Sequence, residues 1–214
     1  VLLHGSLRPL EIDGNNDGFM DFPSGYHLNA INRWRFEQRN GWEGQVGVNV
    51  LTEDRQGGQL SSENAVPKYQ LGWNTNRAEL WGKTGYIFPK AKYRSVGFQG
   101  SAIYHDQTSF YGSRQYDSEQ RSGYFNSIYQ SIIGTSTHKY RAGLSVQYDL
   151  YNERLDSMQF DREEIVPGAF LEYTFSYFDK FAVVAGIRGD YHNYYGLFFT
   201  PRVHARYEIR EGSV

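Results

Sequence analysis

The stretch "KYRAGLSVQYDL", residues 139 to 150, decides the fold, because apolar and polar side chains alternate along it without a break. Its even positions carry Tyr, Ala, Leu, Val, Tyr and Leu, and its odd positions carry Lys, Arg, Gly, Ser, Gln and Asp. A period of two places these sets on opposite faces of a β-strand, whereas a helix repeats every 3.6 residues. The stretch therefore predicts a strand with one apolar and one polar face.

The same alternation recurs along most of the chain. Residues 123 to 133 carry apolar side chains on both faces, and we predict a strand there as well. One more strand is expected near Phe199 and another within residues 1 to 12, so the predicted class is all-β with eight to ten strands. The other alternating stretches are residues 28 to 39, 43 to 50, 77 to 88, 96 to 105, 169 to 177 and 181 to 192.

Strand length and loop length together indicate a membrane barrel. Strands of soluble proteins average about five or six residues, whereas these run to about eleven or twelve, the span of a tilted strand across a bilayer. Short and long connections also alternate, as in antiparallel transmembrane β-barrels of the outer membrane. A soluble β-sandwich and a β-helix stay open as alternatives. The short links are Asn40-Gly41 and residues 89 to 93, 134 to 138 and 178 to 180, and the long ones are residues 52 to 76, 106 to 120 and 152 to 163.

The alternation also predicts which face meets lipid. A shift of one residue would place Lys139, Arg141 and Asp149 in hydrocarbon, and a basic side chain there costs roughly 2–4 kcal/mol. Aromatic residues near the short links, such as Trp42 and Tyr86, predict an interfacial girdle. The residues predicted to line the lumen are Arg141, Asp149, Glu172, Arg188, Asp190, His192, Arg202, His204 and Arg206.

Composition narrows the function classes. The 214 residues include 22 basic and 24 acidic side chains, so no basic surface for nucleic acid is expected. The sequence has no cysteine, which excludes a cysteine nucleophile. The longest apolar run, Phe181 to Ile187, is too short for a membrane helix of about 20 residues. Residues 1 to 20 do not have the pattern of a signal peptide.

Four segments together resemble a known family. They are "DGNNDGFMDFP" (13 to 23), "NRWRFE" (32 to 37), "LTEDRQGGQ" (51 to 59) and "GIRGDYHNYYGLFFTPRVHARYE" (186 to 208). Their order and spacing resemble the barrel of TonB-dependent outer-membrane receptors, particularly those of Bacteroidetes. The resemblance implies a 22-stranded barrel around an N-terminal plug. Residues 1 to 214 are then expected to be a middle segment of that barrel domain, without the plug.

The resemblance also implies a function and partners. The intact receptor would import a scarce nutrient, such as a metal chelate, corrinoid, haem or oligosaccharide, across the outer membrane. Its partners would be outer-membrane lipid, the rest of the barrel, the plug, TonB acting through the plug, and a surface lipoprotein. The alternatives are a passive porin or small closed barrel, and a soluble calcium-binding β adhesin.

The segment "DGNNDGFMDFPSG", residues 13 to 25, resembles part of a calcium loop. Asp13, Asn15 and Asp17 stand at the first, third and fifth places of an EF-hand, but place twelve is Ser24 and no helical pattern flanks the loop. A calcium sensor is therefore not expected. Asp13, Asn15, Asp17 and Asp21 could still hold a structural Ca2+ in an extracellular loop, although any exposed turn uses the same residues.

No enzyme is predicted. Asp190 and His192 lie two residues apart on one strand face, which is the placement of a general-base pair. No nucleophile can be assigned beside them. His105, His192 and His204 are not at the clustered spacing of a metal or haem site, so hydrogen bonding in the lumen is the expected role.

Overall fold

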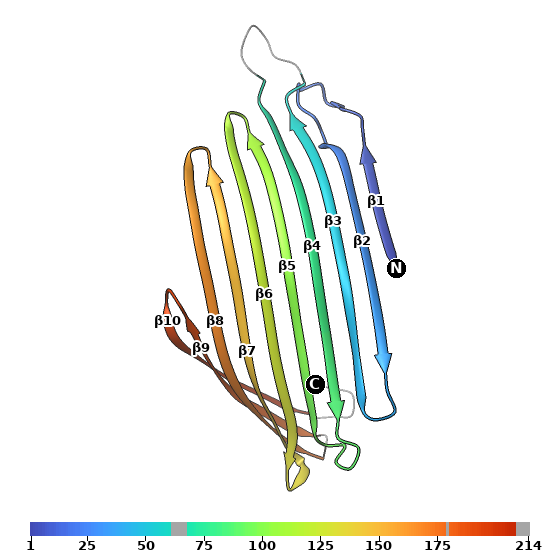
Figure 1. Ribbon diagram of the computed structural model, residues 1–214, viewed down its shortest axis with the longest axis vertical. Coiled ribbons are helices and arrows are strands. Elements are labelled where there is room, and N and C mark those ends of the chain that lie inside the picture. The colour runs from blue at the N-terminus through green and yellow to red at the C-terminus, as the bar shows by residue number, and fades with distance from the viewer. Residues whose placement is uncertain (61–67, 179, 209–214) are drawn as a thin grey trace.

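The chain forms one antiparallel sheet in which every strand pairs with its neighbours in sequence (Figure 1). The computed structural model describes residues 1 to 60, 68 to 178 and 180 to 208. The all-β prediction is confirmed, and the sandwich and β-helix alternatives are wrong, because all ten described strands belong to one sheet. The strands are β1 (Leu2–Arg8), β2 (Ser24–Glu37), β3 (Trp42–Gly58), β4 (Gln70–Ile87), β5 (Ser95–Tyr111), β6 (Arg114–Ile133), β7 (Thr135–Leu155), β8 (Met158–Tyr177), β9 (Phe181–His192) and β10 (Gly196–Tyr207).

The central strands are longer than predicted. Strands β3 to β8 have 17 to 21 residues. The predictions of long loops at residues 106 to 120 and 152 to 163 are wrong, since two-residue turns at 112 to 113 and 156 to 157 join the strands there. Most side chains in these segments are polar, so the segments lack the apolar alternation that marks a strand. Among the described residues, no helix is long and apolar enough to cross a membrane.

The predicted link at residues 52 to 76 is also largely strand. Strand β3 continues to Gly58 and β4 begins at Gln70, and these two residues are directly paired. Residues 61 to 67 of the predicted link lie outside the described residues. The prediction of a loop between β1 and β2 holds for residues 9 to 23, where Phe19 makes an isolated bridge to Gln59.

The described links at the positions predicted to be short lie at one end of the sheet, the lower end in Figure 1, whereas the two-residue turns at 112 to 113 and 156 to 157 lie at the opposite end. Residues 38 to 41 join β2 to β3, and residues 88 to 94 join β4 to β5. The β6–β7 link is tighter than the predicted residues 134 to 138. Gly134 alone separates these strands, with a φ of 72° that glycine adopts without steric cost.

The pairing register gives the sheet two distinct faces, because directly opposed residues point to the same side. We call the side that carries Asp149 the polar face and the side that carries Leu144 the apolar face. Asp149 is opposed by Ser122 on β6 and by Glu164 on β8, whereas Leu144 is opposed by Ser127 and Ala169. The register of residues 123 to 133, which the sequence left open, places the even positions on the polar face.

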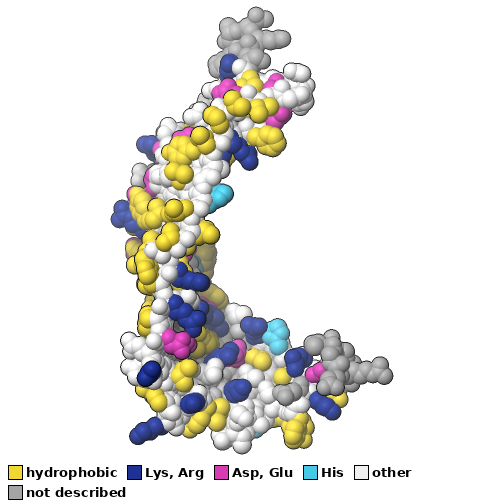
Figure 2. All heavy atoms as spheres, turned by 90° about the vertical axis from the view of Figure 1, so that its right-hand side faces the viewer, with side chains coloured by type: hydrophobic (Ala, Val, Ile, Leu, Met, Phe, Trp, Pro, Cys, Tyr) yellow, Lys and Arg dark blue, Asp and Glu magenta, His cyan; other side chains and the backbone are white. Residues whose placement is uncertain are grey.

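Burial in this sheet is inverted relative to a soluble domain. No hydrophobic side chain among the described residues is buried, and Leu144 and Leu171 are 64% and 52% exposed. Figure 2 shows a curved profile with hydrophobic side chains along the convex side of its tall part. Polar side chains shield one another instead. The buried side chains are all polar: Thr75, Ser109, Asn126, Ser131, Ser145, Asp149 and Asp190.

Candidate functional site

The register places all nine predicted lumen residues on the polar face of β7 to β10. Arg141 on β7 lies directly opposite Glu172 on β8. Arg188 on β9 lies directly opposite Phe170 on β8. Arg202 and His204 lie on β10, opposite Gly186 and Val184. The nine do not form a single cluster, however, but are divided among separate groups. That this face lines a lumen stays a prediction.

One buried group centres on Asp190, whose side chain is 6% exposed. The Arg188 guanidinium donates from Nε and Nη2 to the two Asp190 carboxylate oxygens, at 2.7 and 2.6 Å, and from Nη2 to Ser145 Oγ at 2.8 Å. Arg188 reaches Ser145 on β7 by crossing β8 at Gly168. A Cβ there would lie 2.1 Å from Asp190 Oδ1, so the glycine leaves room for this group.

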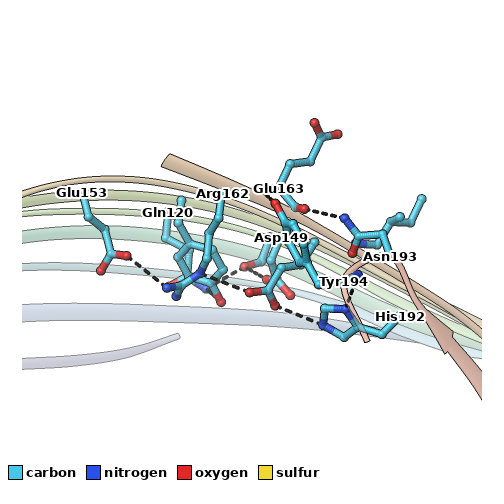
Figure 3. Close-up of polar contacts among 12 residues, drawn as sticks. Gln120, Asp149, Glu153, Arg162, Glu163, His192, Asn193 and Tyr194 are labelled. Carbon is cyan, nitrogen blue, oxygen red and sulfur yellow. Dashed lines mark hydrogen bonds and ion pairs between the residues drawn. The ribbon is translucent and has the colours of Figure 1, made fainter. Parts of the chain in front are cut away.

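A second group joins polar and charged side chains of four strands, β6 to β9, and Figure 3 shows much of it in close-up. His192 Nε2 lies 3.7 Å from Glu164, and Arg162 lies 3.1 Å from Glu164 and 3.3 Å from Glu153. Glu153 accepts a hydrogen bond of 2.6 Å from the Tyr116 hydroxyl, and this bond raises the pKa of the tyrosine. Opposite charges thus alternate between β8 and β7, where Arg162 lies between Glu164 and Glu153.

The β9–β10 turn is tied to β8 beside this chain. The Asn193 side chain donates to the Glu163 carbonyl at 2.8 Å and accepts from the Ile165 N–H at 3.0 Å. His192 Nδ1 accepts the Tyr194 N–H at 3.1 Å, so this nitrogen is unprotonated and Nε2 faces Glu164 (Figure 3). The turn therefore has a defined place against the sheet.

The general-base interpretation of Asp190 and His192 finds no support in these contacts. Asp190 pairs with Arg188, and His192 pairs with Glu164. His105 lies on β5 opposite Arg77 and is not part of either group. Across residues 1 to 60, 68 to 178 and 180 to 208, no three His, Asp or Glu side chains are grouped to hold a metal ion.

A third group, on β2 to β4, was missed because Glu53, Arg55 and Trp73 fall in the predicted link 52 to 76. Glu53 accepts hydrogen bonds from Trp73 Nε1 at 2.6 Å and pairs with His27 Nδ1 at 2.7 Å, and Arg55 lies 3.8 Å away. Burial alone would raise the pKa of Glu53, but the bonds from Trp73 and His27 and the charge of Arg55 outweigh it and lower the pKa. The sequence offers no local signal for this group, because His27 and Trp73 lie 26 and 20 residues from Glu53.

The predicted calcium residues hold their own loop. Asp13 accepts the N–H groups of Asp17 and Gly18 at 3.1 and 2.9 Å. Asp17 accepts the Phe19 N–H at 2.8 Å, and Asp21 accepts the Gly14 N–H at 2.8 Å. Asn15 accepts the Asp17 N–H at 3.2 Å. These bonds explain the Asp- and Asn-rich sequence as loop structure, and calcium binding stays a prediction.

Comparison with known proteins adds little beyond the fold. No known family and no curated protein matches the sequence. Among solved structures, the chain is similar to the siderophore receptor PirA from Pseudomonas aeruginosa, with 10% sequence identity and a TM-score of 0.42. The similarity covers 86% of this chain and 37% of the receptor, so the chain spans little more than a third of that receptor's length. A likeness of this degree establishes neither family nor function.

Proposed function

We propose that the chain forms part of the wall of a transmembrane β-barrel in the bacterial outer membrane. The observation that carries this proposal is the inverted burial, with large apolar side chains exposed on the apolar face and six of the seven buried polar side chains on the polar face. Removing a large apolar side chain from water contributes about 1.5–3 kcal/mol. A sheet with this many exposed apolar residues is therefore stable only if lipid or another apolar phase covers that face.

The height of the apolar band fits a bilayer. On the apolar face the band runs from Trp42 to Val50 on β3 and from Tyr140 to Leu150 on β7, nine and eleven residues. A tilted transmembrane strand needs about 9–11 residues. Polar side chains on the same face end the band. One aligned row across six strands consists of Thr52, Asn76, Asp106, Glu119, Asn152 and Asp161.

The strands continue beyond this polar row, away from the links at residues 38 to 41 and 88 to 94. The longer extensions of outer-membrane barrels lie on the extracellular side, so the extended hairpins would project outside the cell. The three groups around Asp190, Glu164 and Glu53 would line the interior, where water and a passing ligand meet them. Tall extracellular strands and a polar interior suit a receptor that captures a nutrient.

The specific proposal is a TonB-dependent receptor that imports a scarce nutrient, such as a metal chelate, corrinoid, haem or oligosaccharide. It is supported by the residues that resemble this family, of which "GDYHNYYG" (189 to 196) forms the end of β9 and its turn. The partners are outer-membrane lipid, the rest of the barrel, the plug, TonB through the plug, and a surface lipoprotein. The proposed role is transport, without a chemical reaction at these residues.

Two alternatives make different structural demands. A small closed barrel would pair its first and last strands, but β1 and β10 stand at opposite edges of the described sheet. A soluble adhesin would bury its apolar face, and the described residues leave it open. A passive porin would have the same barrel wall as a TonB-dependent receptor. It differs because its transport needs no proton gradient.

Energy dependence separates the receptor from the porin. Uptake of a labelled ferric chelate, cobalamin, haem and an oligosaccharide would be measured in cells with and without the gene, before and after a protonophore. The receptor predicts that one substrate enters only with the gene and only while the proton gradient stands. Gene-dependent uptake that survives the protonophore would support the porin instead.

A further inference from the structure

The upper part of β8 has an open edge. Strand β8 pairs with β9 from Gly168 to Tyr177, and it continues beyond this pairing to Met158, where it pairs with β7 alone. Figure 1 shows the β9–β10 turn well below the β7–β8 turn, so the sheet has a step at this point. Within the described part of the chain, β8 contacts no strand other than β7 and β9.

The β9–β10 turn closes the lower part of this edge. The Glu163 N–H donates to the Tyr194 hydroxyl at 3.3 Å, and the Glu163 carbonyl accepts from the Asn193 side chain at 2.8 Å. The Ile165 N–H donates to Asn193 Oδ1 at 3.0 Å, and the Ile165 carbonyl accepts the Asn193 N–H at 3.3 Å. Glu163 and Ile165 therefore direct both of their backbone groups toward β9.

Two residues further along β8 have no such partner. In an antiparallel strand the N–H and C=O of one residue point toward the same neighbouring strand, and successive residues alternate between the two neighbours. The register with β7 is unbroken, so the backbone groups of Asp161 and Gln159 point the same way as those of Glu163. No described strand or turn bonds to them there, and residues 156 to 163 are all exposed. Such an edge is a template for pairing with another chain.

One side of the open edge carries negative charge without an ion-pair partner. The side chains of Asp161 and Glu163 project to the same face of the sheet, and neither forms an ion pair with a described residue. Asp161 accepts the Gln159 side-chain amide at 2.7 Å. The nearby basic side chains, Arg154 and Arg162, are each paired with other carboxylates. A basic side chain directly opposite Asp161 on an added strand would therefore form a cross-strand ion pair.

The other side of the open edge carries apolar side chains. Phe160 and Met158 lie on the opposite face from Asp161 and are 51% and 50% exposed. An added strand would place successive side chains beside Asp161 on one face and beside Phe160 on the other. The segment that matches this edge best therefore alternates basic and apolar residues.

We propose that the open edge of β8 takes up an extended segment of a partner protein as an added antiparallel strand, with basic and apolar side chains in alternation. Main-chain hydrogen bonds to Gln159 and Asp161 supply affinity, and the alternate side chains supply selectivity. A free carboxyl terminus finds no cation here, because Arg114, Arg154 and Arg162 are all paired with carboxylates. The occupant is therefore an internal segment of a longer chain. The inference goes beyond the proposed function, since it needs neither lipid contact nor transport.

The test is an NMR titration of the full chain in zwitterionic detergent micelles. The probe is the acetyl-Lys-Val-Lys-Val-Lys amide, and the acetyl-Glu-Val-Glu-Val-Glu amide is the acidic control. We expect the basic peptide to bind at least tenfold more tightly than the acidic one. We also expect its C-terminal amide to bind at least as tightly as its C-terminal acid.

Backbone methylation of the probe separates strand pairing from attraction between charges. In the antiparallel arrangement the lysines lie opposite Gln159 and Asp161, so their N–H groups point toward β8 and those of the valines point away. Methyl groups on the backbone nitrogens of the lysines are expected to weaken binding at least tenfold. The same groups on the valines keep every charge and are expected to change binding less than threefold.

Hydrogen exchange at single amides reports where the peptide binds. In the free chain the Gln159 and Asp161 amides face the open edge, so they should exchange at least tenfold faster than the Phe160 and Arg162 amides, which face β7. Saturating basic peptide is expected to slow exchange at Gln159 and Asp161 at least fivefold. Exchange at Phe160 and Arg162 should stay within twofold.

Variants of the chain test the same groups from the other side. Q159P removes one open N–H and keeps every charge, and proline is tolerated at an edge position whose N–H faces away from the neighbouring strand. D161N removes one carboxylate. Each is expected to weaken binding of the basic peptide at least fivefold. The matched control is D106N, in the same row as Asp161 but on β5, which is paired on both sides. It is expected to bind within twofold of the parent chain.

Specific outcomes would overturn the inference. Equal binding of the basic and acidic peptides, equal effects of the two backbone methylations, or unchanged exchange at Gln159 and Asp161 would each do so. If Q159P does not fold by circular dichroism, D161N and the methylated peptides decide. Tighter binding of the C-terminal acid than of the amide would make the occupant a free peptide, contrary to the proposal. None of these results bears on transport, which the uptake experiment tests separately.

Discussion

The indole of Trp81 lies over the backbone of Gly47, the residue directly opposite it on the neighbouring strand. A Cβ at Gly47 would lie 2.4 Å from Trp81 Cζ2. The aromatic ring thus covers a strand glycine and shields the backbone there, an arrangement that offsets the weak packing of glycine in a sheet. It also explains why a tryptophan belongs on the polar face.

Replacement of Gly47 by alanine is expected to destabilise the sheet by about 1–3 kcal/mol, because the new methyl group must displace the indole. The matched control is G97A, where the Cβ has 3.9 Å of clearance, and its stability is expected to stay within about 0.5 kcal/mol of the parent. Urea unfolding in detergent micelles, followed by tryptophan fluorescence, measures both. Equal effects at the two glycines would contradict the packing account.

A charge added to the apolar face is expected to cost more than one added to the polar face of the same strand. Ala102 and Gln99 are both exposed on β5 but point to opposite faces. In lipid vesicles, A102R should lose about 2–4 kcal/mol of unfolding free energy and Q99R less than about 1 kcal/mol. Similar losses for both variants would mean that the faces do not differ in their surroundings.

Glu53 should make the stability of the extended hairpins depend on pH. Its pKa is lowered from the ordinary value of 4.5, so its contribution is fully present above that value and is lost as the pH falls through the lowered folded pKa. Unfolding free energies at pH 7 and pH 3 would be compared for the parent and E53Q. The drop between the two pH values should be smaller in E53Q, and an equal drop would show that Glu53 does not contribute.

The loop at residues 13 to 23 is expected to depend on Asp13, whose carboxylate accepts two backbone N–H groups. In D13A, hydrogen exchange at Asp17 and Gly18 should accelerate severalfold, since each lost bond is worth about 0.5–1.5 kcal/mol. If the loop also binds Ca2+, calcium will slow exchange of residues 13 to 21 in the parent but not in D13A. Equal exchange in calcium and in EDTA would reject the calcium prediction and leave the loop contacts intact.

The sequence predicts the strands of this sheet well where one face of the strand is apolar. The alternation in residues 181 to 192 matches β9 at both ends, and the strand expected near Phe199 is β10. The prediction is wrong at residues 106 to 120, because most side chains there are polar and the strands are held by pairing with each other. Local pattern cannot report a partner that lies elsewhere in the chain.

The sequence predicts on which face the residues of these groups lie, but it does not predict which residues pair with one another. The period of two places Asp190 and His192 on one face, as the register shows. It cannot show that Asp190 pairs with Arg188 while His192 pairs with Glu164, because the second pair depends on how β8 and β9 align. The same holds for Tyr116 and Glu153, which lie 37 residues apart in sequence.

The assignment of one face to lipid and the other to water is tested most directly by a nitroxide scan of residues 139 to 150. The chain has no cysteine, so single cysteines at these positions can be spin-labelled one at a time in lipid vesicles. Accessibility to oxygen, which concentrates in lipid, should peak at the even positions, and accessibility to a water-soluble nickel chelate should be higher at the odd ones. A scan without a period of two, or with the two reagents in the opposite phase, would contradict the account.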